Sequence, residues 1–420
     1  MMLNRRAFLL PTAAALSGFS PMPAQARTVT RRIESGVDHN HCTTRQFQHM
    51  SFCHKGVWFV FYSDGKSYWY QSSADSGENW RRADRPIDTG PNGSTSFDVA
   101  LADDRVYATH VHYPQGRYDP SAAYARDPAK RGEYTSQGRV KEGLFRGGQI
   151  EWVADRDPGF TPDYCNLVRD SEGRLWIFTR QDGAAVAYGQ LDSKDIGKWT
   201  QAEVCIPIQG RHAMDAAALD RGQLFAASIL TTDGKLYGNL YDGKHWGKEP
   251  VLIADDVTRI AGDDRRLSLE FDPTQKLLHL LYIDAASTLR YRSLKAPYGP
   301  GKWYPRLSSP GLELGSGIFT SALSADSSRT PYGLIVTYEI EKYTGKDARV
   351  YTGELYARRF DGRRWAGRPL LVSEPDTIMN WYPNVNQDAR DGLCVLYSKS
   401  EDERDPMIPL SIMVTLFHVL

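Results

Sequence analysis

The chain has 420 residues, 41% of them hydrophobic, and its 51 Lys and Arg residues balance 51 Asp and Glu residues. A chain of this length and composition can bury a full hydrophobic core and lacks the high net charge of disordered proteins. The balanced charge excludes a strongly basic surface for nucleic acid or for anionic membranes, so we expect neither as a partner.

The first 26 residues have the pattern of an export leader. A basic pair precedes a short apolar run, and the segment closes on AQA at 24–26, the small-x-small sequence that signal peptidase accepts. NRRAFL at 4–9 resembles the bacterial twin-arginine export motif, with an ordinary secretory signal as the alternative. The apolar run is too short to span a bilayer. We therefore predict a leader at 1–26, one domain at 27–420, and an exported, periplasmic or extracellular protein without a membrane partner after cleavage.

The five cysteines are scattered and form no C-x-x-C pair. A chain of this size does not need disulfide bonds, so we expect free thiols, with one bridge as the alternative in an oxidising compartment. The two His-x-His pairs lack the additional ligands of a zinc site. We predict neither a metal nor a cofactor, and the sequence leaves the oligomeric state open.

After the leader, an unassigned extended stretch, TVTRRIES at 28–35, precedes a series of internal repeats. Each repeat has two extended segments joined by a tight turn, and the second segment recurs about every 50 residues. The second segments end at Tyr62, Tyr113, Arg180, Thr231, Tyr282, Tyr338 and Tyr397. Six repeats then close on a tryptophan after a glycine-containing turn, which places a third strand before the turn and a fourth strand at the indole. These residues are Trp80, Trp152, Trp199, Trp246, Trp303 and Trp365.

Four short antiparallel strands per repeat are typical of a β-propeller blade. We therefore predict an all-β protein with a single seven-bladed β-propeller, and a six-bladed propeller is the alternative. The last repeat has no closing tryptophan. We expect the N-terminal strand at 28–35 to complete the seventh blade and close the ring, because this removes two exposed strand edges.

The eight residues SADSGENW, at 73–80, fit the pattern S-x-D-x-G-x-x-W. This pattern is the Asp-box, so the repeat resembles those of the sialidase superfamily, where the box is a structural turn away from the binding site. The Asp75 carboxylate is expected to accept backbone N–H groups within the turn, and Gly77 to supply a left-handed conformation. Ser73 completes the pattern, and Trp80 is expected to pack between sheets.

A binding site is expected at the opposite end of the strands, where three long loops, 114–123, 339–352 and 400–409, meet. This end gathers Tyr, His and Arg residues, which suit a sugar that carries a carboxylate, because aromatic rings stack on sugars and Arg binds carboxylates. The catalytic candidates are His112, His212, Tyr338 and Tyr382. The substrate-binding candidates are Arg45, Arg180, Arg265, Trp381 and Asn384.

Several neighbouring residues have a simpler interpretation. Alternation along a strand places His110 and His112 on one side of it. His49 is expected to be a hydrogen-bonded core residue, and Tyr282 and Tyr397 are expected to pack within blades. Three aspartates in D-G turns are explained by turn formation, namely Asp64, Asp182 and Asp233.

The predicted architecture resembles seven-bladed polysaccharide lyases that act on ulvan or on rhamnosyl-glucuronate linkages. The resemblance implies β-elimination on a uronic-acid glycan, in which an Arg neutralises the carboxylate, a neutral His or a Tyr removes the C5 proton, and a Tyr protonates the leaving oxygen. The Arg would be Arg180 or Arg45. The base would be His112 or His212, and the acid would be Tyr338 or Tyr382.

Two other functions stay open. The Asp-box alone implies a sialidase-like exo-glycosidase, but Arg45 is followed by Gln46-Phe47 instead of the Ile-Pro of that family. Tyr338 and Glu339 are neighbours on a strand and point to opposite faces, so they do not form the family's nucleophile pair. The third function is a sugar-binding propeller without catalysis. Because the candidate residues differ between repeats, we favour one central site in an enzyme.

Overall fold

The computed structural model describes residues 27–37, 43, 49–89, 97–112, 137–162, 165–210, 212–230, 233–257, 267–286, 288–296, 298, 318–326, 333–343, 351–360, 365–373, 380–401 and 409–418. The predicted leader at 1–26 lies outside these residues, as do Arg45, Arg265 and the long loop at 114–123. Every regular element in the described part of the chain is a β-strand, which confirms the all-β prediction. Among the same residues, no helix is long and apolar enough to cross a membrane.

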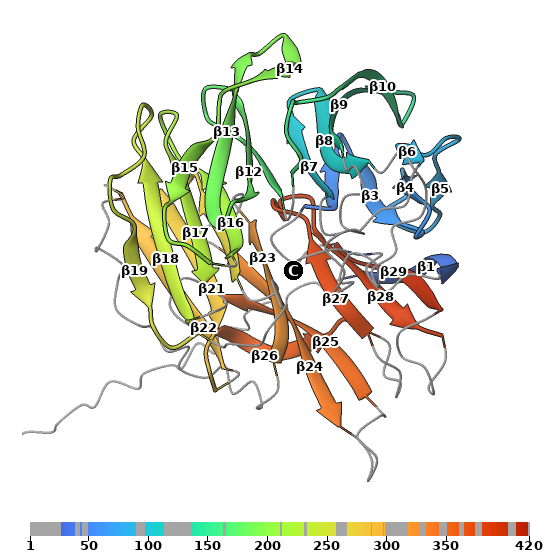
Figure 1. Ribbon diagram of the computed structural model, residues 1–420. Coiled ribbons are helices and arrows are strands. Elements are labelled where there is room, and N and C mark those ends of the chain that lie inside the picture. The colour runs from blue at the N-terminus through green and yellow to red at the C-terminus, as the bar shows by residue number, and fades with distance from the viewer. Residues whose placement is uncertain are drawn as a thin grey trace, which may run out of the picture.

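The described strands form seven antiparallel sheets, which we number in chain order (Figure 1). Sheet 1 has β2 (Ser51–His54), β3 (Val57–Ser63), β4 (Ser67–Ser73), β5 (Arg81–Arg82) and β6 (Asp88–Thr89). Sheet 2 has β7 (Phe97–Ala102), β8 (Arg105–His112), β9 (Gln137–Arg146) and β10 (Gln149–Arg156). Sheet 3 has β11 (Asn166–Arg169), β12 (Leu175–Gln181), β13 (Ala184–Asp192), β14 (Asp195–Trp199) and β15 (Glu203–Ile206). Sheet 4 has β16 (His212–Ala218), β17 (Leu224–Leu230), β18 (Lys235–Tyr241) and β19 (Val251–Ala254).

The remaining sheets follow the same up-and-down order. Sheet 5 has β20 (Leu267–Asp272), β21 (Leu277–Ile283) and β22 (Leu289–Lys295). Sheet 6 has β23 (Ile318–Asp326), β24 (Gly333–Tyr343), β25 (Tyr351–Phe360) and β26 (Trp365–Leu371). Sheet 7 has β27 (Asn380–Val385), β28 (Leu393–Ser400), β29 (Leu410–His418) and, from the other end of the chain, β1 (Arg27–Val37).

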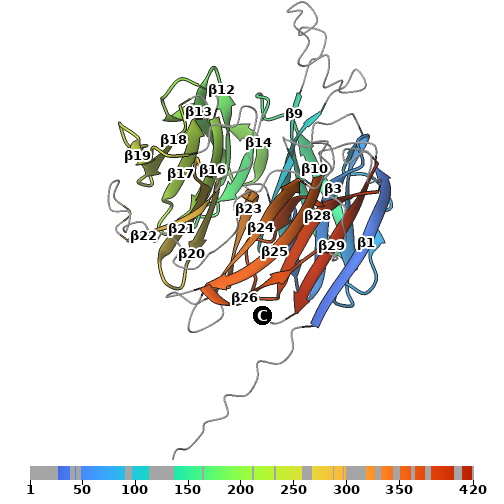
Figure 2. The ribbon, with the colours of Figure 1, turned by 90° about the horizontal axis from the view of Figure 1, so that it is seen from below.

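β1 is the outer strand of sheet 7 and runs antiparallel to β29, with Arg27 opposite His418 and Thr30 opposite Thr415. Figure 2 shows this pair along one side of the molecule. The two ends of the described chain therefore meet in one sheet, so that β1 covers the edge that β29 would otherwise expose.

Tight turns join the strands within a sheet. Between β12 and β13, Asp182 and Gly183 both have positive φ, of 48° and 77°, which a two-residue type I′ hairpin requires. Asp64 and Asp233 each accept backbone N–H groups of the residues that follow them. These contacts confirm that the aspartates of the D-G sequences form turns.

The first strands of neighbouring sheets are joined by buried polar side chains at one equivalent position. Asp98 in sheet 2 and Asp215 in sheet 4 each accept a backbone N–H from the first strand of the next sheet. Asn384 in sheet 7 accepts the N–H of the residue that precedes β2 of sheet 1. The donors are Leu167, Leu269 and Met50. Because these acceptors are fully buried, losing the bonds would leave unsatisfied polar groups inside the molecule.

Hydrophobic clusters fill the space between neighbouring sheets. The largest side chains buried there include Trp176, Tyr62, Tyr68, Tyr282 and Tyr397. The packing roles predicted for Tyr282 and Tyr397 are confirmed, since their exposed fractions are 2% and 0%.

Candidate functional site

The two ends of the sheets differ in their connections. We call the end that carries the hairpin turns between first and second strands the lower end, and the end where the second strands finish the upper end. At the lower end, Lys55 forms an ion pair with Asp104, which joins the hairpin turns of sheets 1 and 2. At the upper end, β8 finishes at His112.

One carboxylate contacts two imidazoles between sheets 1 and 2 at the upper end. Asp88 Oδ2 lies 2.6 Å from His110 Nε2 and 3.0 Å from His112 Nδ1. Asp88 lies in β6, opposite Tyr68 of β4, so sheet 1 brings the carboxylate to the face of sheet 2 that carries both histidines. The prediction that His110 and His112 share one side of their strand is confirmed.

The two histidines differ in exposure and in their electrostatics. The His110 side chain is fully buried, and burial lowers its pKa although the hydrogen bond to Asp88 acts in the opposite direction. His112 keeps 24% of its side chain exposed. Burial disfavours the charged form of Asp88, but the hydrogen bond from His110 and the positive potentials of His112 and Lys141 lower its pKa to about 2. Asp88 is therefore ionised at neutral pH.

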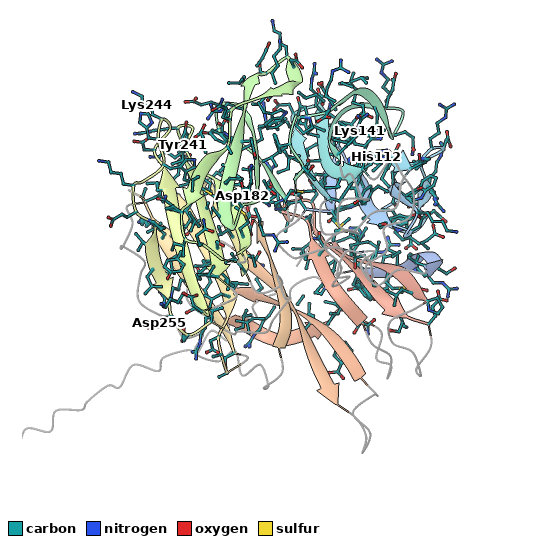
Figure 3. The ribbon with its side chains drawn as sticks, viewed as in Figure 1. His112, Lys141, Asp182, Tyr241, Lys244 and Asp255 are labelled. Carbon is teal, nitrogen blue, oxygen red and sulfur yellow. The ribbon has the colours of Figure 1, made fainter. Side chains whose placement is uncertain are left out.

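Cations from β9 lie on the same face of sheet 2. Arg139 is opposite His110 in the register, and Lys141 is opposite Ala108. Both side chains lie 2.9 Å from Asp155 Oδ2 on β10. Burial disfavours the charged form of Asp155, but the hydrogen bonds from the two cations lower its pKa. Figure 3 shows His112 and Lys141 over the neighbouring strands β8 and β9.

The arrangement fixes the chemistry that is open to His112. Because Asp88 is an ionised acceptor, the Nδ1 of His112 carries the proton, and this assigns an unprotonated Nε2 to the neutral ring. A partly exposed imidazole with a carboxylate on its other nitrogen is suited to remove a proton from a bound substrate. Arg139, with 30% of its side chain exposed, supplies positive charge on the same face.

A pocket of about 510 Å³ lies against sheet 3 and includes Arg180. Its other walls come from residues 158–161, β12, β13 and residues 200–201. Arg180 is opposite Ala185 in the register and so shares the face of sheet 3 that packs on sheet 4, and the contacts described above do not bring it together with His112.

The turn at 73–80 forms a closed network of its own. The Asp75 carboxylate accepts the backbone N–H of Asn79 at 2.9 Å, and Ser73 Oγ accepts the N–H of Gly77 at 2.8 Å. Gly77 has φ +85°, and a Cβ atom there would lie 2.5 Å from the Leu416 side chain. These bonds satisfy the groups of the turn internally, so they account for Ser73, Asp75 and Gly77 as structural residues. Trp80 packs against the adjoining hydrophobic cluster as predicted.

The chain resembles known proteins in its structure and not in its sequence. No family model and no curated protein matches the chain. A solved structure of an ulvan lyase of polysaccharide lyase family PL25, bound to -[GlcA(1-4)Rha3S]-, matches at 11% identity with a TM-score of 0.55, over 91% of this chain and 95% of that one. The polysaccharide lyase Uly1 matches at 9% identity with a TM-score of 0.51, over 95% of this chain and 100% of that one.

The chain has the fold of these propeller lyases. The predicted resemblance to β-propeller polysaccharide lyases is therefore confirmed at the level of the fold. Because both identities are near 10%, the likeness assigns no residue of this chain a role.

Of the other candidate residues, the structure describes the side chain of Asn384 and, for four more, only the position in a strand. Asn384 is fully buried, and its Oδ1 accepts the Met50 N–H, so this bond gives it a structural role. His212 lies at the start of β16, Tyr338 within β24, and Trp381 and Tyr382 within β27. The side chains of these four residues are outside what the structure describes. In the described part of the chain, no group of three or more His, Cys, Asp or Glu side chains is arranged to hold a metal ion.

Several residues of the cluster between sheets 1 and 2 were not candidates from the sequence. These are Asp88, Arg139, Lys141 and Asp155. The alternation R-x-K in β9 was a usable signal, because it places two cations on one sheet face. Asp88 had no such signal, since β6 is a two-residue strand and its contact with β8 depends on how two sheets pack.

Proposed function

We propose that this protein is an exported carbohydrate-active enzyme that cleaves an acidic, uronic-acid-containing glycan by β-elimination at the upper end of a seven-bladed propeller. The observation that carries the proposal is the partly exposed His112 imidazole, held by the ionised Asp88, with Arg139 on the same face of sheet 2. The fold shared with polysaccharide lyases supports the class of reaction by analogy alone.

Two features support a closed propeller with seven blades. Each of the seven sheets is one blade, and blade 7 combines β27, β28 and β29 with β1. The bond from Met50 N to Asn384 Oδ1 joins blade 7 to the segment before β2, which connects the last blade to the first. We infer that these two contacts close the ring.

The reaction would divide between a base, a cation and an acid. His112 Nε2 takes the C5 proton next to the uronate carboxylate, and the electron pair of that C–H bond forms the C4–C5 double bond as the C4–O bond breaks. Arg139 offsets the negative charge that develops on the carboxylate. Tyr338 or Tyr382 protonates the leaving oxygen, and His212 is the alternative base. Arg45, Arg265 and Trp381 remain proposed contacts of the substrate.

The first experiment measures absorbance near 235 nm and reducing ends in parallel, with purified protein on uronic-acid polysaccharides and rhamnosyl-glucuronate oligosaccharides. We expect both signals to rise, and His112→Ala to lower the rate at least about 100-fold, as is typical for loss of a general base. The control is His245→Ala, which removes an exposed histidine from a turn of sheet 4 and should leave the rate unchanged.

The other outcomes separate the alternative functions. Reducing ends without absorbance would mean hydrolysis, as in the sialidase-like exo-glycosidase. Binding without either signal would mean a sugar-binding propeller. Elimination that survives in His112→Ala would remove His112 as the base and return the role to His212.

A further inference from the structure

The outer strand of sheet 2, β10, contains a β-bulge. Trp152 is opposite Gly143 in β9. The next pair joins Ala154 to Glu142, so β10 has one residue more than β9 over this step. The extra residue is Val153, which is 46% exposed and so adds little to the core. A bulge interrupts strand pairing, and bulges are over-represented next to active sites, where they direct a side chain to a different face.

The bulge decides which face of sheet 2 carries Asp155. Side chains alternate along a strand, so without the extra residue Ala154 would share the face of Trp152, and Asp155 would point to the other face. In the structure, Ala154 packs against the hydrophobic cluster between sheets 2 and 3, whereas Asp155 is opposite Lys141. The bulge therefore brings the carboxylate to the face that carries Arg139 and the two histidines.

The charged groups on this face divide into two sets. The two imidazoles contact Asp88, whereas both cations, Arg139 and Lys141, contact Asp155 Oδ2. Lys141 also interacts electrostatically with Asp88. Without Asp155, the cations would be drawn to Asp88, because an ionised carboxylate is the strongest acceptor for a cationic donor. They would then compete with the imidazoles for that carboxylate.

The contact with Asp155 fixes Arg139 without using all of its donors. Asp155 Oδ1 is buried and makes no hydrogen bond to the described residues, so Arg139 meets the carboxylate through one oxygen and not through a two-bond fork. A guanidinium has five N–H donors in a fixed plane, and this one is partly exposed, so donors remain for a second anion. The nearly buried Lys141 holds the same oxygen from the interior.

We propose that Asp155, directed by the bulge at Val153, is a positioning residue that holds Arg139 in place for one anionic group of a bound glycan and keeps both cations away from Asp88. The inference rests on the proposed function for the identity of that group, a uronate carboxylate, which a guanidinium binds well. If Asp155 acted through its charge alone, removing the charge would tighten anion binding. If it acts through the position of Arg139, removing the charge weakens anion binding.

The test measures binding by calorimetry on full-length protein. One probe is a C-linked uronate disaccharide, in which a methylene group replaces the glycosidic oxygen so that no leaving group is present. The other probe is its uncharged counterpart, with a hydroxymethyl group in place of the carboxylate. We expect Asp155→Asn to weaken binding of the charged probe about tenfold, as loss of a charge-assisted hydrogen bond does, and to leave the uncharged probe unchanged. Glu151→Gln is the matched control, because it removes the same charge from β10 at an exposed pair with Arg146.

Deleting Val153 tests the bulge itself. The deletion moves Asp155 to the other face, so the charged probe should lose affinity as it does in Asp155→Asn. The same deletion combined with Ala154→Asp and Asp155→Ala puts a carboxylate opposite Lys141 again without a bulge, and should restore the affinity. Thermal midpoints control for folding in all variants, and nitrogen chemical shifts of the two imidazoles report whether the cations have moved to their carboxylate.

Each outcome decides a different claim. Unchanged or tighter binding of the charged probe in Asp155→Asn, an equal loss for the uncharged probe, or the same loss in Glu151→Gln would overturn the positioning role. A folded rescue variant that does not regain affinity would contradict the role of the bulge. If Asp155 is needed to bind the charged probe but wild-type protein eliminates nothing from uronate glycans, the positioning role stands and the proposed reaction falls. Elimination in Asp155→Asn with unchanged kcat and KM would keep the reaction and remove Asp155 from it.

Discussion

Asp88 is shared by two imidazoles, and this sharing gives the two rings different roles. The buried His110 stays neutral because burial lowers its pKa, so it donates one N–H to Asp88 without adding charge. That donation holds the carboxylate in place for His112, whose ring is the one that reaches the surface. His110 and Asp88 are therefore positioning residues in the proposed reaction, and His112 is the group that would touch substrate.

Replacing Asp88 tests this division of roles. In Asp88→Asn, the amide no longer requires a proton on His112 Nδ1, so the ring populates both tautomers. We expect the elimination rate to fall by about 10²–10⁴-fold, the range that one general base contributes.

Two readouts distinguish positioning from simple destabilisation. Nitrogen chemical shifts of His112 report the tautomer directly and should change in Asp88→Asn. The thermal midpoint serves as the control for folding. An unchanged tautomer would contradict the assignment, whatever happens to the rate.

The sequence alone predicted His112 as a candidate residue but did not predict its partner Asp88. His112 could be predicted because side chains along a strand point alternately to its two faces, so residues two apart share a face. Asp88 is 22 residues from His110 along the chain, and their contact forms only when sheet 1 packs on sheet 2. Arg139 and Lys141 had the alternating pattern as well, but a charged pair on a strand is most often solvated, and here Asp155 holds both.

Among the elements, β1 depends on a polar cluster that fastens it to sheet 1. Glu34 of β1 accepts hydrogen bonds from the Tyr62 hydroxyl at 3.0 Å and from Arg82 at 2.8 Å. The Arg82 guanidinium lies 3.7 Å over the Trp69 ring, and Gln71 donates to the Ile33 carbonyl. β1 therefore has contacts with sheet 1 in addition to its pairing with β29.

Removing the Glu34 carboxylate should loosen this element before the rest of the fold. In Glu34→Ala, the hydroxyl of Tyr62 loses its acceptor in a partly buried site and the guanidinium of Arg82 keeps Asp64 but loses Glu34, at a cost of about 1–3 kcal/mol. Hydrogen exchange should then rise in β1 and in the facing amides of β29, while β16 and β17 keep their protection.

Glu78→Ala is the matched control for this change. Glu78 also pairs with arginines of β1, but those arginines are 62% and 45% exposed, and exposed ion pairs contribute about 0–1 kcal/mol. Equal exchange in both variants, or faster exchange spread over all sheets in Glu34→Ala, would show that the cluster does not fasten β1 specifically.

The repeats predicted the strands well, and the tryptophans less well. The indole was expected to begin the fourth strand, but Trp152 lies inside β10 and Trp199 ends β14. The reason is that the indole anchors the turn: Trp80 Nε1 donates to the Gly77 carbonyl and Trp199 Nε1 to the Ile196 carbonyl, each three residues back. A bond of this kind fixes the turn, and the next strand begins wherever its own pairing starts.

The whole molecule gathers buried ionisable groups where its first strands meet. Asp215 accepts the N–H groups of Leu269 and Ala216 at 2.6 Å and 2.8 Å. Burial raises its pKa to about 8, and the negative charge of Asp98 adds to that shift, while His49 and the two N–H groups act against it. Glu270, also fully buried, has its pKa raised by burial and by Asp388 and Asp215. The predicted core role of His49 agrees with its place 3.5 Å from Asp98.

The raised pKa of Asp215 gives the fold a defined dependence on pH. An aspartate in the unfolded chain titrates near about 3.9, so between about pH 4 and pH 8 the folded protein holds a proton at Asp215 that the unfolded chain has released. Within that window, stability therefore falls as pH rises, because the folded state binds the extra proton. We expect the urea midpoint of the wild type to decrease from pH 5 to pH 8.

Asp215→Asn should flatten this decrease, since the amide stays neutral at every pH and can still accept the Leu269 N–H, as Asn384 does for Met50 at the equivalent position. Asp75→Asn is the control, because the hydrogen bonds to the exposed Asp75 lower its pKa to about 2, so that it stays ionised across the window in both states. A wild-type slope retained in Asp215→Asn would assign the pH dependence to Glu270 or Asp98 instead.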